Sequence, residues 1–252
     1  MRRKWLILLF ILVLFIILLG SVQAWAEPVP LPRVDLTIDQ SDQPQEVVDS
    51  LRLLVILTVL SLVPAILVLM TSFTRIIVVL SFVRSALATQ QTPPNQVLIG
   101  LALFLTLFTM APVYQQVKTQ AVDPYLAQRI SQEEALERAS GPIKQFMFKQ
   151  TREKDLALFV NMSKMDRPNS KEDIPLTVLI PAFVISELKT AFQMGFIIYI
   201  PFLVIDMVVA STLMSMGMFM LPPVMISLPF KILLFVMVDG WYLVVKSLLE
   251  SF

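Results

Sequence analysis

Two long apolar blocks, residues 51–117 and 176–252, constrain the fold of this chain more than any other feature. Each block is interrupted by one adjacent pair of prolines, within Thr92–Asn95 in the first and at Pro222–Pro223 in the second. The segments on either side are long enough to cross a bilayer, which takes about 20 residues of helix. With 56% hydrophobic and 15% charged residues, the chain is also far more apolar than an average soluble domain. We therefore expect an all-α membrane-associated protein in which each block forms a helical hairpin.

Between the hairpins lies a polar insert, residues 118–175, which we expect to form a small helical module outside the cytoplasm. Asp123 followed by Pro124 predicts the start of one helix, and Ser131 with Glu134 predicts the start of another. Apolar residues then recur at helical spacing in two groups, Ile143, Phe146 and Met147 followed by Leu156, Phe159 and Val160. These two stripes either pack within a small cap or form contacts between subunits.

The first 26 residues have the pattern of a cleavable signal peptide. Three basic residues precede an apolar run from Trp5 to Leu19, and small residues end at Ala26, after which we expect cleavage. The alternative, an uncleaved anchor, needs a longer apolar run than this one. Residues 27–50 contain several prolines and aspartates, so we expect a flexible, extended lead-in there.

The signal peptide also decides the expected topology. An exported N-terminus followed by two passes places the insert outside the cytoplasm and the turn of the first hairpin, which carries Arg84, inside it. The positive-inside rule would instead place the insert, with its many basic residues, in the cytoplasm. Acidic residues in the insert nearly equal the basic ones in number, however, and its length approaches the limit of that rule.

Charged residues inside the apolar blocks argue against four simple membrane spans, since a charge that faces lipid is costly. Glu187 and Lys189 are two positions apart, so they point to different sides of one helix and each needs a partner elsewhere. Lys231 and Asp239 lie too far apart along the chain for a direct pair on one helix. The whole set consists of Arg75, Glu187, Lys189, Asp206, Lys231 and Asp239.

Three interpretations of these charges stay open. They could be buried ion pairs that set the register between helices, on one chain or between subunits. They could form a proton or ion relay, as intramembrane carboxylates do in transporters. An intramembrane aspartyl protease using Asp206 and Asp239 is the third, although the flanking residues lack the glycine-rich motif of such enzymes and Asp239 sits in a turn-like setting.

Other catalytic chemistry is limited because the chain contains no histidine and no cysteine. It therefore has no imidazole or thiolate metal site, no Ser-His or Cys-His nucleophile and no disulfide. We expect neither enzymatic activity nor a cofactor. The net charge of +1, with basic residues interleaved among acidic ones, also argues against a nucleic-acid partner.

A methionine-rich loop, residues 214–223, ends the first helix of the second block. Its four methionines recur at every second residue, so a helix could not point them all one way. Gly217 and the Pro222–Pro223 pair predict that the helix stops here. Because methionine is flexible and apolar, a ring of such loops from several subunits could close an opening to ions yet yield to a bulky chain. The alternative is a methionine-filled turn in the core.

Four segments of the apolar blocks are long and distinctive: TSFTRIIVVLSFVR at 71–84, ATQQTPPNQVLIG at 88–100, LIPAFVISELKTAFQMGF at 179–196 and SLPFKILLFVMVDGW at 227–241. Together they resemble the FliP family of flagellar type III export-gate proteins. With residues 201–223, the resemblance covers most of the chain from residue 51 onward. The signal peptide, the lead-in and the insert diverge from it.

The resemblance implies a pentamer that assembles with FliQ and FliR into a conical, oligomeric gate. This gate would lie at the inner membrane of a bacterium, in the flagellar basal body, and unfolded flagellar proteins would pass through it. Further partners that the resemblance implies are the export components FlhA and FlhB and the assembly factor FliO. On assembly the charged hairpins would leave the lipid, so that Arg75, Arg84 and the other charges become buried or interface residues.

Within the family, a methionine-rich loop described as a gasket forms the constriction, and the matching residues here are Met218, Phe219 and Met220. Many relatives carry methionine at the middle position, and the stiffer Phe219 implies a tighter or differently shaped seal. The corresponding subunit of a virulence injectisome is one alternative function. A secondary transporter or ion channel, with solute flux that depends on Asp206 or Asp239, is the other.

Overall fold

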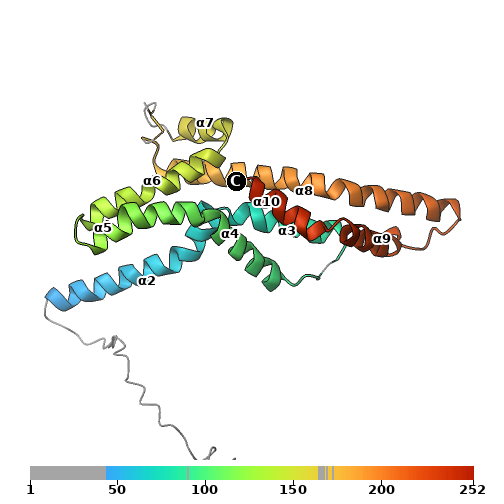
Figure 1. The fold of residues 1–252 in the computed structure, drawn as a ribbon, viewed down its shortest axis with the longest axis horizontal. Helices are drawn as coiled ribbons and strands as arrows, with labels where there is room; N and C mark the ends of the chain where they lie inside the picture. Colours follow the sequence, from blue (N-terminus) through green and yellow to red (C-terminus); the bar gives the residue numbers. More distant parts are fainter. Residues whose placement is uncertain (1–43, 90, 164–167, 169, 172) are drawn as a thin grey trace, which may run out of the picture. The chain divides into compact units, whose positions relative to one another are not determined.

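The structure, a computed structural model, describes residues 44–89, 91–163, 168, 170–171 and 173–252 (Figure 1). The expected signal peptide with its cleavage at Ala26, and residues 27–43 of the expected lead-in, lie outside the described residues. The chain divides into two compact units, residues 1–51 and 52–252, and every contact given below lies within the second.

The described part of the chain is helical and contains no strand, which confirms the all-α fold class. Its elements, in order, are α2 (Pro44–Met70), α3 (Phe73–Ala86), α4 (Asn95–Val117), η1 (Lys118–Val122), α5 (Asp123–Leu126), α6 (Gln132–Gln150), α7 (Glu153–Met162), α8 (Leu176–Ser215), α9 (Pro223–Met237) and α10 (Gly240–Glu250). Within these residues three helices are long and apolar enough to cross a membrane, with α9 and α10, bent by 63°, as a fourth candidate if they count as one span.

The first apolar segment is broken between α2 and α3, without any proline or glycine at the break. Hydroxyl groups make this possible, since Thr71 Oγ1 donates to Leu67 O at 2.5 Å and Thr74 Oγ1 donates to Val68 O at 2.6 Å. They satisfy carbonyl groups that the end of a helix leaves without a backbone partner. Ser72 Oγ shares a further hydrogen bond of 2.5 Å with Thr109 Oγ1, which ties the break to α4.

The start of α2 corrects the expected lead-in. Residues 44–50 are helical rather than extended. Pro44 is compatible with this because the first turn of a helix needs no proline N–H. From there to Leu51, where the first hairpin was expected to begin, the sequence contains no glycine or further proline to stop the helix.

Helix α3 packs against both α4 and α8 and supplies the centre of the main core. Ile76, Val79, Leu80 and Val83 are fully buried there. Helix α8 approaches α3 closely at Gly195, where a Cβ atom would come within 2.5 Å of the ring of Phe82. The two apolar blocks are therefore packed together.

Helix α4 continues through η1 into α5, which begins at Asp123 as predicted, but Asp123 is not an N-cap because the residue before it is already helical. Val122, the residue before it, already has helical dihedral angles of −69° and −51°. Asp123 N donates to Lys118 O, one residue farther back than in an α-helix. This wider π-helical turn accommodates Pro124, whose ring would otherwise collide with the preceding turn.

The insert contains the two expected amphipathic helices, α6 and α7. Ser131 caps α6 as predicted, since its side chain accepts a hydrogen bond of 3.2 Å from Glu134 N. The side chain of Glu134 pairs instead with Arg138. The apolar stripes of both helices pack against Leu179 and Phe183 of α8. They pack on the second hairpin of their own chain, outside the insert, and not within a self-contained cap.

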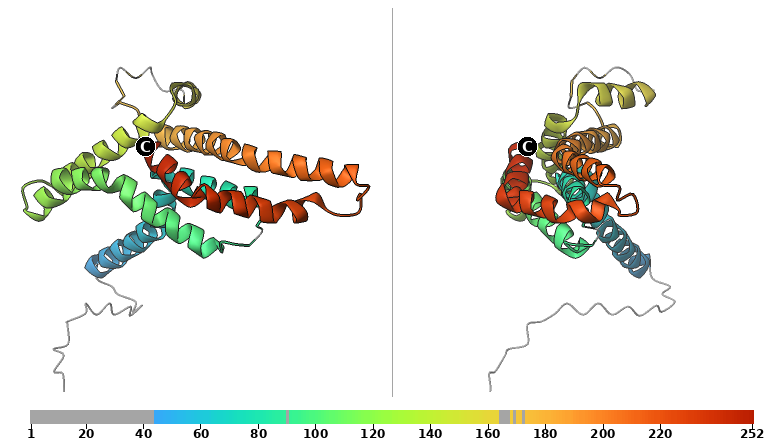
Figure 2. Two further views of the ribbon diagram at one scale, coloured as in Figure 1. Left: turned by 45° about the vertical axis from the view of Figure 1, so that its right-hand side comes forward. Right: turned by 90° about the vertical axis from the view of Figure 1, so that its right-hand side faces the viewer.

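Helices α8 and α9 run side by side as the second hairpin (Figures 1 and 2). The chain bends again after α9, where Asp239 adopts a left-handed conformation with φ 52°. The turn-like setting expected for Asp239 is thus confirmed. The bend lets α10 bring Val244 and Leu248 into the main core beside Phe235.

Candidate functional site

The tip of the second hairpin, residues 214–223, is shaped by one glycine and two prolines. Gly217 has a positive φ of 75°, which places it in the left-handed region. Gly217 N donates to Met214 O and Met218 N donates to Leu213 O, the paired hydrogen bonds of a Schellman motif. Helix α9 then starts at Pro223. The predicted stop of the helix at this loop is confirmed.

The side chains of this tip loop point away from the folded chain. Met218 is 43% exposed, Phe219 78% and Met220 96%. A methionine-filled core turn would have buried them, so that alternative does not describe this loop. Large apolar side chains this exposed require a partner surface or a membrane to cover them.

Behind the tip, Asp206 of α8 joins two residues of α9. Lys231 Nζ donates to Asp206 Oδ2 at 2.6 Å, and Ser227 Oγ donates to Asp206 Oδ1 at 2.5 Å. The side chain of Lys231 is 2% exposed and that of Asp206 21%. Because Ser227 and Lys231 are four positions apart, they face the carboxylate from the same side of α9. This Asp206 cluster fixes the register of the hairpin.

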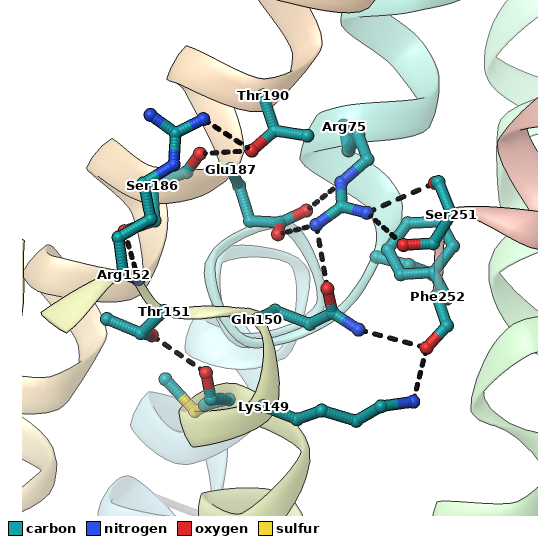
Figure 3. Close-up of polar contacts among 12 residues, drawn as sticks. Arg75, Lys149, Gln150, Thr151, Arg152, Ser186, Glu187, Thr190, Ser251 and Phe252 are labelled. Carbon is teal, nitrogen blue, oxygen red and sulfur yellow. Dashed lines mark hydrogen bonds and ion pairs between the residues drawn. The ribbon is translucent and has the colours of Figure 1, made fainter.

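At the other end of α8, Arg75 and Glu187 form an ion pair across α3 and α8 (Figure 3). Arg75 Nε donates to Glu187 Oε2 at 2.9 Å, and Nη2 donates to Glu187 Oε1. The two side chains are 3% and 0% exposed. The geometry is bidentate, with the planar guanidinium matched to the carboxylate, which makes such a pair strong and directional.

The remaining donors of Arg75 reach two further segments. Nη1 donates to Ser251 O at 2.8 Å, and Nη2 donates to Gln150 Oε1 at 3.0 Å. The guanidinium also lies 4.2 Å from the ring centre of Phe252. Gln150 Nε2 completes the ring by donating to Phe252 O at 3.1 Å. This Arg75 cluster therefore joins α3, α6, α8 and the residues after α10.

A second polar link lies one residue from Glu187. Ser186 Oγ donates to Asp155 Oδ2 at 2.7 Å and accepts from Arg152 N at 3.1 Å. The Arg152 side chain reaches farther along α8 and donates to Gln193 Oε1 at 2.6 Å. Figure 3 shows the hydrogen bond between Arg152 and Ser186 beside the Arg75 cluster. Helix α7 is thereby held to α8 by polar as well as apolar contacts.

The other predicted charges lie outside these clusters. Arg84 Nη1 donates to Asn95 Oδ1 and Pro93 O. Arg84 therefore holds the end of α3 to the start of α4. Lys189 is exposed, and in the described part of the chain it has no ion-pair partner. Asp239 is exposed at the bend after α9, and its side chain likewise bonds to none of the described residues.

These contacts favour a structural role for the buried charges. Both oxygens of Asp206 are engaged by Lys231 and Ser227, whereas Asp239 lies at the bend and outside this cluster. Two carboxylates that share a proton, as in an aspartyl protease, need to be close neighbours. Among the residues that the structure describes, no group of three or more carboxylates could hold a metal ion.

Sequence reasoning missed Ser227 of the Asp206 cluster and Gln150, Ser251 and Phe252 of the Arg75 cluster. Ser227 could have been found, because it lies one helical turn before Lys231 and so on the same face. Gln150 and Phe252 carry no comparable signal, since their partner Arg75 is far away in sequence. Only the packing of α3, α6 and α8 brings them together.

Comparison with known proteins decides the family. A sequence model described as the FliP family matches residues 56–248. The chain belongs to the FliP family. Flagellar biosynthetic protein FliP of Bacillus subtilis is 65% identical over 217 residues, which cover 86% of this chain and 98% of that protein. The proteins of the same name from Pectobacterium carotovorum and Aquifex aeolicus are 56% and 51% identical, over 81% and 88% of this chain and 79% and 92% of their own length.

Proposed function

We propose that this FliP-family chain is a core subunit of the flagellar type III export gate, through which unfolded flagellar proteins leave the cytoplasm. Its family and the names of its relatives make it a membrane component of the flagellar export apparatus. The finer proposal is a pentamer that combines with FliQ and FliR at the bacterial inner membrane. FlhA and FlhB would supply further parts of the apparatus, and FliO would assist assembly.

The tip loop is the observation that carries this proposal. Met218, Phe219 and Met220 stand at the end of a long hairpin and are exposed, although all three are apolar. One chain alone leaves them uncovered. A ring of copies would bring the loops together and form an apolar seal, which excludes hydrated ions and deforms around a passing polypeptide.

The buried charges support this proposal by explaining how such hairpins are held. The Arg75 and Asp206 clusters would be costly in contact with lipid, but inside a protein assembly they orient α3, α8 and α9. Lys189 and Asp239, which are exposed here, are then candidates for contacts with neighbouring subunits. The hairpins would then be inserted in the lipid only before the gate assembles.

Processing and domain organisation complete the proposal. Cleavage after Ala26 would free the mature N-terminus outside the cytoplasm and place the insert, residues 118–175, on that side. The hairpins, residues 51–117 and 176–252, would then form the body of the gate.

A triple alanine variant of the tip loop tests the proposed seal. Replacing Met218, Phe219 and Met220 with alanine is expected to raise the ion conductance of the inner membrane, because the smaller side chains leave an opening between neighbouring loops. The measurement is ion leak in cells that carry the assembled apparatus.

A matched control truncates three exposed apolar side chains of the insert, by changing Leu136, Leu158 and Met162 to alanine. This control should not leak. Unchanged conductance in the tip variant, with normal assembly of the protein, would exclude the tip loop as the seal.

A further inference from the structure

Helix α8 carries an uncovered ridge along one side. Its members recur at every third or fourth residue, so they fall within a sector of about 80° around the helix axis. All of them are exposed, and all but the first are apolar: Lys189, Phe192, Phe196, Ile200, Leu203 and Met207. We call this set the α8 ridge. Its charged member, Lys189, lies at the end far from the tip loop.

A groove of about 560 Å³ lies on another side of the same hairpin. Val204, Val208 and Thr212 of α8 form one wall, and Ile226 and Phe230 of α9 contribute to the other. The three α8 residues are centred about 120° around the helix from the ridge. A single copy of the chain therefore presents its ridge and its groove in different directions.

The α9 wall of the groove extends to an acidic end. Ile226, Phe230, Leu233 and Met237 are exposed and recur at every third or fourth residue, which places them on one side of α9. Asp239 follows at the bend before α10, and it is exposed as well. We call the groove with this extension to Asp239 the groove surface. It is mainly apolar, and its charge also lies at the end far from the tip loop.

The ridge and the groove surface are complementary in charge. Lys189 and Asp239 have opposite signs, and neither has an ion-pair partner within the part of the chain that the structure describes. A ridge on one side and a groove on another suit a head-to-tail contact, in which the ridge of each copy meets the groove of the next. Such contacts form a ring when the rotation between copies closes, as the proposed gate requires.

Hydrogen bonds within the hairpin show how far apart the two charges lie along it. Asp206 bonds to Ser227 and Lys231, so it is level with the middle of this turn of α9. Asp239 lies about ten residues beyond that turn, which makes it level with a point about ten residues before Asp206 on the antiparallel α8. That point is about seven residues, or roughly 10 Å, from Lys189.

A neighbouring copy shifted by about 10 Å along the hairpin, away from the tip, would bring its Asp239 to Lys189. The same shift would bring the part of its groove around Val208 to Ile200 and Leu203, in the middle of the ridge. One displacement thus satisfies the ionic and the apolar contacts together.

We propose that the α8 ridge of one copy binds the groove surface of the next copy, with an ion pair between Lys189 of the first and Asp239 of the second. This pairing rests on the proposed function, in which several copies assemble, and it identifies the surfaces by which they recognise each other. The ion pair would fix the shift between neighbouring hairpins, and with it the relative positions of their tip loops.

Reversing one charge and neutralising the other tests the pair. Lys189→Glu sets two carboxylates against each other and should lower the fraction of oligomeric full-length protein, measured by native mass spectrometry, by about tenfold. Asp239→Asn should weaken assembly in the wild-type background but strengthen it in the Lys189→Glu background, where it removes the repulsion. Both side chains are exposed, and asparagine tolerates the left-handed conformation at position 239, so the fold should persist.

Lys154→Glu is the matched control, because it makes the same change at an exposed position of α7 outside both surfaces. It should leave the oligomer fraction unchanged, and Asp239→Asn should weaken assembly equally with and without it. A change of sign in the Lys189→Glu background alone distinguishes a direct pair from a general effect of charge.

Cross-linking locates the contact, since the chain contains no cysteine. A short bismaleimide should join Lys189→Cys in one tagged copy to Asp239→Cys in a differently tagged copy, whereas Lys154→Cys with Asp239→Cys should give no mixed dimer. Oligomers that form normally but show neither the change of sign nor the mixed dimer would overturn this pairing and leave the proposed function standing. A wild-type chain that forms no oligomer, alone or with FliQ and FliR, would contradict the proposed function as well.

Discussion

Replacing Glu187 with glutamine is expected to lower the free energy of unfolding by about 3–5 kcal/mol. The change leaves the guanidinium of Arg75, which is 3% exposed, without its counter-charge. The hydrogen bonds from Arg75 to Gln150 and Ser251 remain, but they do not neutralise a buried cation. Thermal or denaturant unfolding of the detergent-solubilised protein measures the loss.

The control for this prediction is Lys189→Gln, two residues away on the same helix and exposed. Its effect should stay within about 0.5 kcal/mol. Replacing both Arg75 and Glu187 with methionine should cost less than the single change at Glu187, because no unpaired charge remains buried. If Glu187→Gln unfolds like the wild-type protein, the Arg75 cluster does not stabilise the fold in the way its contacts indicate.

Asp206→Asn is expected to have the second largest effect on stability, a loss of about 3 kcal/mol. Asparagine can still accept a hydrogen bond from Ser227, so the loss comes mainly from Lys231, whose side chain is 2% exposed and would keep its charge without a carboxylate. Asp206 is itself 21% exposed, which lets water compensate part of the charge and places the value at the lower end of the range for broken buried pairs. The same unfolding assay applies.

Asp239→Asn provides the comparison, since Asp239 is exposed and its loss should leave stability nearly unchanged. Combining Asp206→Asn with Lys231→Met should recover part of the stability, because the buried cation is then removed as well. A variant with Asp206→Asn that stays fully stable but no longer supports export would contradict the structural role and favour the proton relay.

The stops of the helices were predictable where the sequence carries the residues that enforce them. Gly217 and Pro223 end α8 and begin α9 because one residue permits a positive φ and the other lacks an N–H. The break at Thr71 was not predictable in the same way. It depends on hydroxyl groups that bond to the preceding carbonyls, and these hydroxyls are equally compatible with an unbroken helix.

The partners of the buried charges were the least predictable part of the site. The sequence indicates that Glu187 needs a partner, because a carboxylate in an apolar helix cannot remain alone. It does not indicate Arg75, which lies 112 positions earlier. Asp123 and Pro124 marked the start of α5, but they did not indicate that a π-helical turn joins α5 to α4 without a break, because this turn removes the clash that normally ends a helix before proline.

Convergence of the tip loops from several copies is the claim on which the proposed function depends, and cysteine cross-linking tests it directly. The chain contains no cysteine, so Phe219→Cys introduces a single reactive thiol at a side chain that is 78% exposed. In the assembled apparatus, a short bismaleimide should join copies of the chain through this residue, whereas Leu136→Cys on the insert, at a side chain that is 66% exposed, serves as the control. Efficient cross-linking at position 219 is the predicted result. Intact assemblies, verified by native mass, in which position 219 never cross-links would contradict the seal.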